Sequence, residues 1–204
     1  MGAEQRNPGG RPRGFDEDHA LAAATEVFWR LGYEGASMTE LTQAMGINKP
    51  SLYATFGSKE ELFVRALERY RRSYFEELGT ILRHPTAYGV LESYLRSTAG
   101  AVLARDVPGC LSIQGGLACG PANARIPLLL AEYRRGIEDA VAEALSETEI
   151  AGAPGVDAAG LARFAVTIGQ GLAVDAAAGV PQTRLDATVD VALAGLAGLL
   201  GRAS

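Results

Sequence analysis

Apolar residues recur at intervals of three and four along most of the chain, the spacing of one face of a helix. The spacing predicts helices over about 16–31, 59–83, 90–102, 129–145, 157–178 and 182–200. Gly32 ends the first of these runs, and Pro85 ends the second because proline disfavours helical geometry in the residue before it. No segment shows sustained alternation of apolar and polar residues between hairpin turns. The pattern predicts an all-α fold.

Residues 37–62 contain local signals for two short helices that meet at a steep angle. Ser37 and Glu40 form a Ser-x-x-Glu capping box at the start of the first helix. Gly46 suits the tight turn, Asn48 suits the second N-cap, and Pro50 falls in the first turn, where a missing amide hydrogen is tolerated. These signals predict a helix-turn-helix with helices at about 38–45 and 49–55.

The second short helix has one apolar and one polar face. Its apolar face is expected to join a small core made of Leu41, Met45, Ile47, Leu52 and Phe56. Its outward face offers Lys49, Ser51, Tyr53 and Thr55. A cation and hydrogen-bonding groups of this size suit phosphate oxygens and base edges in a DNA major groove.

The same stretch resembles the DNA-binding signature of the TetR family of bacterial repressors over about the first 65 residues. The matching positions are Gly32, Tyr33, Ser37, Leu41, Gly46, Ile47, Leu52, Tyr53, Phe56, Ser58, Lys59 and Leu62. The resemblance implies an N-terminal three-helix DNA-binding domain and a larger all-helical ligand-binding and dimerisation domain. We divide the chain into a flexible basic arm (1–14), a DNA-binding domain (15–60) and a ligand-binding domain (61–204).

The resemblance also implies roles for single residues. Base contacts are expected from Thr39, Lys49, Pro50 and Ser51, and phosphate contacts from Ser37, Tyr53, Thr55 and Lys59. Thr55 departs from the histidine or tyrosine of many members, so we expect it to reach phosphate less well, or through water. The implied function is a homodimeric repressor that leaves a palindromic operator when a small molecule binds.

Charge is distributed unevenly along the chain. The formal net charge is −5, yet residues 1–75 hold ten basic and ten acidic residues, so the excess of acid lies in the remainder. Arg11 and Arg13 lie in a Gly-Arg-Pro-Arg sequence that resembles the core of minor-groove AT-hook peptides. The arm is therefore either a minor-groove contact or a solubilising leader.

The ligand-binding half offers a mostly apolar set of pocket candidates, each of which also fits ordinary core. They are Tyr94, Cys110, Ile113, Gln114, Tyr133, Phe164 and Ile168, with Arg125 and Asp175 as the nearby charges. We expect a small, mostly apolar effector, no cofactor and no metal. Cys110 and Cys119 are read as structural thiols, with a redox or metal-sensing pair as the alternative.

The last two helices are rich in alanine, glycine and leucine, and small residues let helices approach closely. We expect a four-helix interface between two subunits, built from the following residues of the two helices: Gly169, Gly171, Ala173, Ala176, Ala177, Ala192, Leu193, Leu196, Ala197 and Leu200.

Other function classes receive less support. His19 and His84 stand alone and no nucleophile, base and acid converge by spacing, which argues against an enzyme. An interaction module that has lost DNA binding is a further alternative. The chain lacks a run of roughly 18 apolar residues and a secretory leader, so we expect a cytoplasmic protein.

Overall fold

The computed structural model describes residues 15–104, 107–151 and 155–200, and over these ranges the chain forms helices and no β-strand. The elements are α1 (Glu17–Gly35), α2 (Met38–Met45), α3 (Lys49–Phe56), α4 (Lys59–Ile81), α5 (Ala87–Ala101), α6 (Leu111–Gln114), the 3-10 turn η1 (Pro121–Asn123), α7 (Arg125–Ser146), α8 (Ala158–Ala177) and α9 (Gln182–Leu200). The all-α prediction is confirmed. Arg11 and Arg13 of the predicted arm lie outside the described residues.

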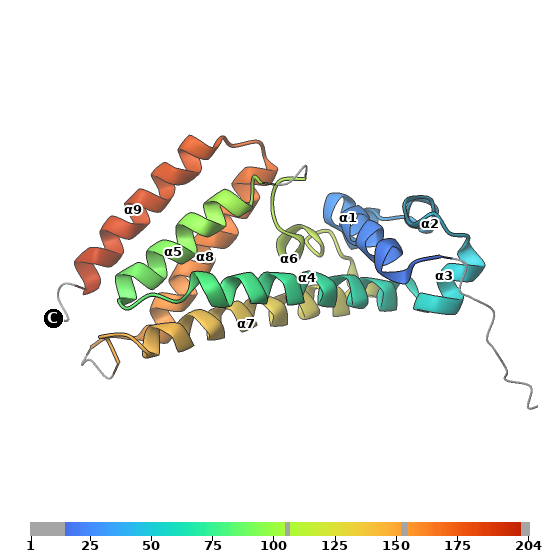
Figure 1. The fold of residues 1–204 in the computed structure, drawn as a ribbon. Helices are drawn as coiled ribbons and strands as arrows, with labels where there is room; N and C mark the ends of the chain where they lie inside the picture. The colour runs from blue at the N-terminus through green and yellow to red at the C-terminus, as the bar shows by residue number, and fades with distance from the viewer. Residues whose placement is uncertain (1–14, 105–106, 152–154, 201–204) are drawn as a thin grey trace, which may run out of the picture.

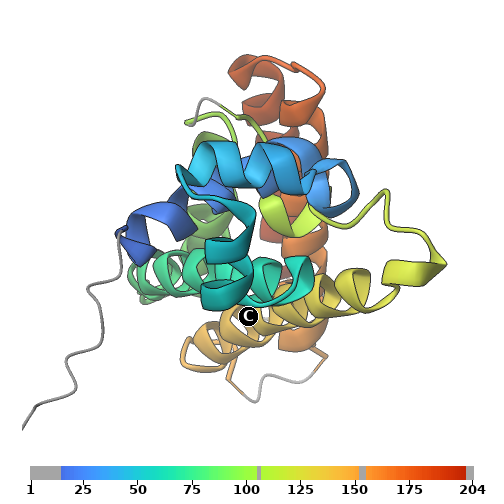
Figure 2. The same ribbon diagram turned by 90° about the vertical axis from the view of Figure 1, so that its right-hand side faces the viewer.

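The helices form an elongated molecule with a small head and a larger body (Figure 1). Helices α1, α2 and α3, together with the first turn of α4, make the head, which faces the viewer in Figure 2. Helices α5, α8 and α9 pack together at the opposite end, and α4 runs from the head into the body (Figure 1). Within the described residues, no helix has both the length and the apolar character that a membrane span requires.

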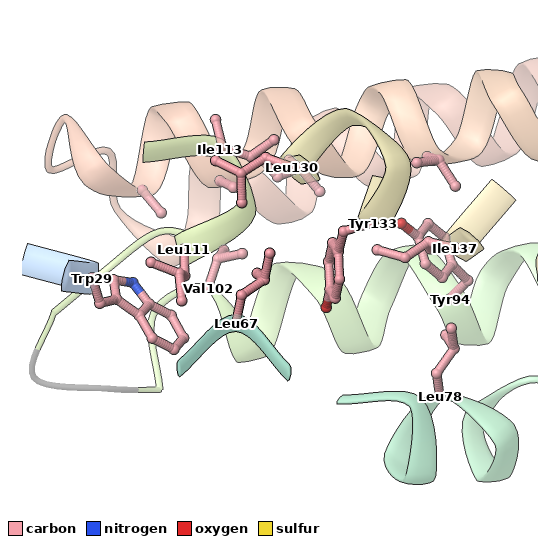
Figure 3. Close-up of a cluster of buried hydrophobic side chains, with 14 of the residues drawn as sticks. Trp29, Leu67, Leu78, Tyr94, Val102, Leu111, Ile113, Leu130, Tyr133 and Ile137 are labelled. Carbon is pink, nitrogen blue, oxygen red and sulfur yellow. The ribbon is translucent and has the colours of Figure 1, made fainter. Parts of the chain in front are cut away.

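Aromatic side chains attach α1 to α4. The rings of Phe28 and Phe63 meet edge to face with centroids 5.0 Å apart, and Tyr33 approaches Phe63 at 5.3 Å. About two turns further along α4, Trp29 meets Tyr70 edge to face at 5.1 Å. Such pairs add to the free energy gained from burying the rings. In Figure 3, Trp29 of α1 lies beside Leu67 of α4 and Leu111 of α6.

A kink in α1 connects this helix to α6. The sequence predicted that the helix ends at Gly32, but it continues to Gly35 beyond a kink at which Gly32 has φ 69° and ψ 175°. The kink frees the Tyr33 amide from the helix, and this N–H donates to the Gly115 carbonyl at 2.8 Å. A Cβ at residue 32 would lie 3.2 Å from the Gln114 carbonyl oxygen. Glycine is therefore needed here both for its positive φ and for the close approach of α6.

A second connection joins the head to the segment before α7. The carboxylate of Glu34 accepts from the Gly120 amide at 3.2 Å and from Asn123 Nδ2 at 2.8 Å. Arg125 forms an ion pair with Glu60 in the first turn of α4. Arg125 therefore pairs with α4 near the head and is not one of the residues that line the cavity, so it does not supply the charge that was predicted near a ligand.

The residues expected in the subunit interface divide between the inside and the outer surface of the subunit. Gly171, Ala177 and Ala197 are exposed, whereas most of the others are buried where α5 packs against both helices, among them Gly169, Ala173, Ala176, Ala192, Leu193 and Leu196. The outer surface of the two helices also carries larger apolar side chains. These exposed residues are Phe164, Val174, Val191 and Leu199.

Alanine substitutions of two helical glycines, one at the kink and one in a regular helix, should change stability in opposite directions. Gly32→Ala should lower the free energy of unfolding by more than about 1 kcal/mol, because alanine disfavours a positive φ and would press on α6. Gly79→Ala, in the exposed interior of α4 with no atom within 4 Å of its Cβ, should raise it by about 0.5–1 kcal/mol. Urea unfolding at one protein concentration measures both. Equal effects of the two substitutions would contradict the role of the kink.

Candidate functional site

Helices α2 and α3 form the predicted helix-turn-helix, and side-chain caps set where each helix begins. Ser37 Oγ accepts from the Glu40 amide at 3.1 Å, while the Glu40 carboxylate accepts from the Ser37 amide at 3.0 Å. Gly46 turns the chain with φ 65°. Asn48 Oδ1 then accepts from the Ser51 amide at 2.8 Å and starts α3. The predicted bounds of both helices are confirmed, with α3 one residue longer.

A small apolar core holds α3 in place. Leu41 and Leu52 are completely buried, and Met45 and Phe56 are nearly so. Ile47 packs against this core as predicted, but it is only half-buried, because it lies in the exposed turn between the two helices. The core fixes the orientation of α3 relative to α2, so that the opposite face of α3 is presented to solvent as a rigid surface.

The exposed face of α3 carries part of the predicted reading set. Lys49, Pro50 and Tyr53 are exposed, and half of the Tyr53 side chain is accessible. Ser51 and Thr55, which were predicted to point outward, are half-buried at the margins of this face. Ser37 and Thr39 are exposed at the start of α2. The DNA contacts assigned to these residues stay predictions.

The carboxylates of the head are held by hydrogen bonds. The pKa of Glu40 is lowered chiefly by its bond from the Ser37 amide, and that of Glu61 by its bond from the Ser58 amide. The pKa of Glu34 is lowered by the hydrogen bonds from Asn123 and Gly120. All three groups therefore stay ionised and engaged at neutral pH. Each carboxylate thus has a hydrogen-bond donor within the chain itself.

Lys59 is placed differently from the other predicted phosphate contacts. Its ammonium lies 4.6 Å from the centre of the Tyr33 ring, a cation–π arrangement. Burial lowers the pKa of Lys59, and the neighbouring Glu34 carboxylate opposes that shift. Lys59 therefore strengthens the attachment of α1 to α4, and a phosphate contact by this residue stays a prediction.

The body encloses a cavity of about 300 Å³, lined by residues of α1, α4, α5, α6, α7 and α8. Three of the predicted pocket residues, Tyr94, Cys110 and Ile113, line it. Tyr133 is buried beside two lining residues, with ring centroids 5.6 Å from Tyr70 and 6.0 Å from Tyr74. Figure 3 shows Tyr133 and Ile137 of α7 close to Tyr94 of α5.

Three predicted pocket residues lie elsewhere. Gln114 packs under Gly109, and its Nε2 donates to the Pro108 carbonyl at 3.4 Å. Phe164 and Ile168 face a surface groove shared with α9, and Phe164 is 46% exposed. The residues of α8 that line the cavity include Val166, Gly169 and Ala173. Phe164 and Ile168 lie on a different face of the same helix, so they point away from the cavity. The assignment of Phe164 and Ile168 to the pocket does not hold.

Sequence reasoning missed several lining residues, among them Trp29, Tyr70, Tyr74, Glu77 and Arg134. Trp29 belongs to the predicted DNA-binding domain, so nothing in its own segment placed it at a ligand site. The four-residue spacing of Tyr70 and Tyr74 was a usable signal, since it puts both hydroxyls on one face of α4. Asp175 is exposed and outside the cavity, so Glu77 and Arg134 are the charged groups along its wall.

Burial sets the chemistry of the cavity. It raises the pKa of Tyr70, Tyr74 and Tyr94 well above the ordinary tyrosine value, so all three hydroxyls stay protonated near neutral pH. Neutral hydroxyls can donate hydrogen bonds to a carbonyl or hydroxyl oxygen of a ligand. Among the described residues, no group of three or more histidine, cysteine or acidic side chains is placed to hold a metal ion.

Comparisons with known proteins agree with this arrangement. The family model "Bacterial regulatory proteins, tetR family" matches residues 20–66. The transcriptional repressor ComR of Escherichia coli K12 is 32% identical over 181 residues, which are 86% of each protein. The repressor BdcR of the same organism is 38% identical over 108 residues, 52% of this chain and 55% of BdcR.

A solved structure extends the likeness to a DNA complex. A cysteine mutant of the TetR family regulator CifR, complexed with 26-base-pair operator DNA, shares 38% sequence identity with this chain. The TM-score is 0.84, and the alignment covers 90% of this chain and 98% of CifR. The likeness therefore includes both the head and the body.

The cap of α3 predicts separate effects on stability and on DNA binding. Asn48→Ala removes the acceptor for the Ser51 amide and should lower the free energy of unfolding by about 1 kcal/mol. Asn48→Asp keeps the acceptor and should preserve stability, but its negative charge should weaken binding to double-stranded DNA. Urea unfolding and a DNA titration measure the two effects. Unchanged DNA affinity of Asn48→Asp would contradict placement of this helix start against phosphate.

Proposed function

The chain belongs to the TetR family of bacterial transcriptional regulators, and on this basis we propose that it is a homodimeric repressor that binds a palindromic operator and leaves it when a small molecule enters the cavity. The observation that carries the DNA-binding step is the rigid, exposed face of α3, with Lys49, Pro50 and Tyr53 on it. The named repressors ComR and BdcR and the operator complex of CifR support this step.

The contacts follow from where each side chain sits. We assign base reading to Thr39, Lys49, Pro50 and Ser51, which lie in the first turns of α2 and α3. Phosphate contacts are assigned to Ser37, Tyr53, Thr55 and Lys59. The hydroxyl oxygen of Ser37 accepts a hydrogen bond from the Glu40 amide, so the hydroxyl proton of Ser37 can still donate to a phosphate. Half-buried Thr55 is the weakest phosphate donor of this set.

The dimer is supported by the outer face of α8 and α9. Phe164, Val174, Val191 and Leu199 are each about half exposed or more in the single chain, so the face is markedly apolar. Two copies of this helix pair would cover those residues in a four-helix interface with two-fold symmetry. Two reading helices related by such symmetry would enter major grooves about one helical turn, or a multiple of it, apart.

The effector is expected to be a small, largely apolar molecule without net charge. The cavity wall is mostly apolar, its tyrosines are neutral, and Glu77 and Arg134 offer one charge of each sign. Occupancy would shift the population toward a form in which the two reading helices no longer match successive grooves. We place this activity in the bacterial cytoplasm, where the chromosome lies.

One tyrosine variant tests DNA recognition directly. Duplexes enriched from random sequence by the wild-type protein supply the specific site, and scrambled duplexes supply the non-specific one. Tyr53→Phe should lose specific and non-specific affinity in equal proportion, by about three- to tenfold, because one hydrogen bond to phosphate is removed. Tyr88→Phe, in α5 and remote from the reading face, is the matched control and should bind normally.

Two results would contradict the assignment at different levels. A loss confined to one base position would move Tyr53 from phosphate contact to base reading. Failure of the wild-type protein to enrich any duplex would contradict the proposed function as a whole.

A further inference from the structure

Aromatic side chains from three helices line the cavity. They are Trp29 of α1, Tyr70 and Tyr74 of α4, and Tyr94 of α5. The rings of Trp29 and Tyr70 meet edge to face, and those of Tyr70 and Tyr74 lie 6.1 Å apart, centroid to centroid. A flat aromatic ligand can join such a set, because ring pairs add to the free energy gained from burying the rings. The cavity wall therefore favours an aromatic ring over a flexible chain.

Arg134 reaches the same cavity from α7. Its Nη1 donates to the Ser112 carbonyl of α6. Burial lowers the pKa of Arg134, and Cys110 and Glu138 oppose that shift, so the guanidinium stays charged at neutral pH. Within the described part of the chain, this guanidinium makes no second hydrogen bond and no ion pair. Because a guanidinium carries several N–H donors, donors remain for a ligand in the cavity.

Short contacts connect Arg134 with the aromatic side chains. Ser112, which holds the guanidinium through its carbonyl, is buried, and its hydroxyl lies 3.1 Å from Cys110 Sγ. Cys110 Sγ in turn lies 3.2 Å from the Tyr70 hydroxyl. The guanidinium and the tyrosine rings therefore border the same part of the cavity. A ring held against Tyr70 can place an oxygen substituent at Arg134.

The charges along the wall distinguish a neutral oxygen from an anion. Glu77 of α4 also lines the cavity, and its carboxylate repels an anionic ligand. The carboxylate of Glu138, one turn further along α7, already acts on the Arg134 guanidinium in the stabilising direction. An anionic ligand would gain less from Arg134 for this reason and would also lose its hydration. A carbonyl oxygen accepts the same hydrogen bonds at a smaller cost of dehydration.

We propose that the cavity binds a small uncharged aromatic carbonyl compound, such as an aryl ketone, with its ring against the tyrosines and its carbonyl oxygen on Arg134. The inference rests on the proposed function and names the class of its effector. Arg134 sets the specificity, because its charged donors form a hydrogen bond that a hydrocarbon cannot accept. Binding makes and breaks no covalent bond.

Arg134 also gives the ligand a short route to the head. The guanidinium that binds the ligand holds the Ser112 carbonyl in α6. Gly115 follows α6 directly, and its carbonyl accepts from the Tyr33 amide of α1 at 2.8 Å. This hydrogen bond forms the α1–α6 junction. A ligand that draws Arg134 toward itself therefore pulls on one partner of the junction.

Two compounds of similar shape test the role of Arg134 in the full-length protein. Acetophenone has an aromatic ring and a neutral carbonyl, and ethylbenzene has CH2 in place of the carbonyl. Arg134→Gln should weaken acetophenone binding at least about tenfold, because a hydrogen bond from a charged donor is lost. Ethylbenzene should bind the wild-type protein and this variant within about twofold, because it has no acceptor. Ligand-observed NMR titrations measure both affinities.

Two further variants control for structural effects. Arg135→Gln, at the adjacent exposed position, is the matched control and should bind both compounds as the wild-type protein does. Arg134→Lys keeps a positive charge for the Ser112 carbonyl but lacks the planar fork of arginine, so it should also lose acetophenone affinity and keep ethylbenzene affinity. Circular dichroism shows that each variant is folded. Equal losses for the two compounds would make Arg134 a structural residue only and overturn the inference.

A third compound tests the charge of the ligand. Benzoate places a carboxylate where acetophenone has its carbonyl. The wild-type protein should bind acetophenone at least about tenfold more tightly than benzoate, because the cavity disfavours an anion. Tighter binding of benzoate would overturn the proposed ligand class.

Operator binding connects recognition with release. Acetophenone, at a concentration that saturates the wild-type cavity, should lower the operator affinity of the wild-type protein and of Arg135→Gln at least about tenfold. The operator affinity of Arg134→Gln should fall by less than about twofold under the same conditions. Unchanged operator affinity of the wild-type protein with acetophenone bound overturns the inference and leaves the repressor intact. Absence of operator binding by the ligand-free protein contradicts the proposed function itself.

Discussion

The seating of α1 against both α4 and α6 is the constraint on which the rest of the structure depends. On one side, Phe28 and Tyr33 pack around Phe63 of α4. On the other, the kink at Gly32 exposes the Tyr33 amide to the Gly115 carbonyl at 2.8 Å. Because α1 packs against α2, and α2 against α3, the seating of α1 also fixes the position of the reading face. A hydrogen bond at a single kinked position is easily broken, and so suits a switch better than a broad apolar contact does.

The distribution of charge complements this mechanical arrangement. The head carries ionised groups that are held by amides and rings, such as Glu40 on the Ser37 amide and Lys59 on Tyr33. The cavity carries neutral hydroxyls, since burial keeps Tyr74 and Tyr94 protonated. A ligand without charge can therefore enter the body with little electrostatic effect on the head. Signalling between the two parts must then pass through packing and hydrogen bonds at α6.

Local chemistry made the head predictable from sequence, whereas the cavity depends on contacts between distant segments. Ser37, Gly46 and Asn48 set helix ends through contacts with residues at most four positions away in the chain. The sequence therefore placed α2 and α3 correctly. Helical spacing could not distinguish the two apolar faces of α8, and Phe164 was assigned to the wrong one. Gly32 resembled an ordinary helix end, because the carbonyl that accepts from the adjacent Tyr33 amide belongs to Gly115, far away in the chain. Trp29 was missed as a cavity residue for the same reason.

Hydrogen exchange at the Tyr33 amide tests the central claim, that the α1–α6 junction couples the cavity to the reading head. Exchange would be followed in the full-length protein and in its Gly169→Leu variant, whose added side chain fills part of the cavity, with the amides of α3 as the reference. We predict that the substitution lowers protection of the Tyr33 amide at least about tenfold while α3 keeps its protection, since the junction opens and the head stays folded. Loss of operator affinity in this variant with unchanged protection at Tyr33 would contradict the account.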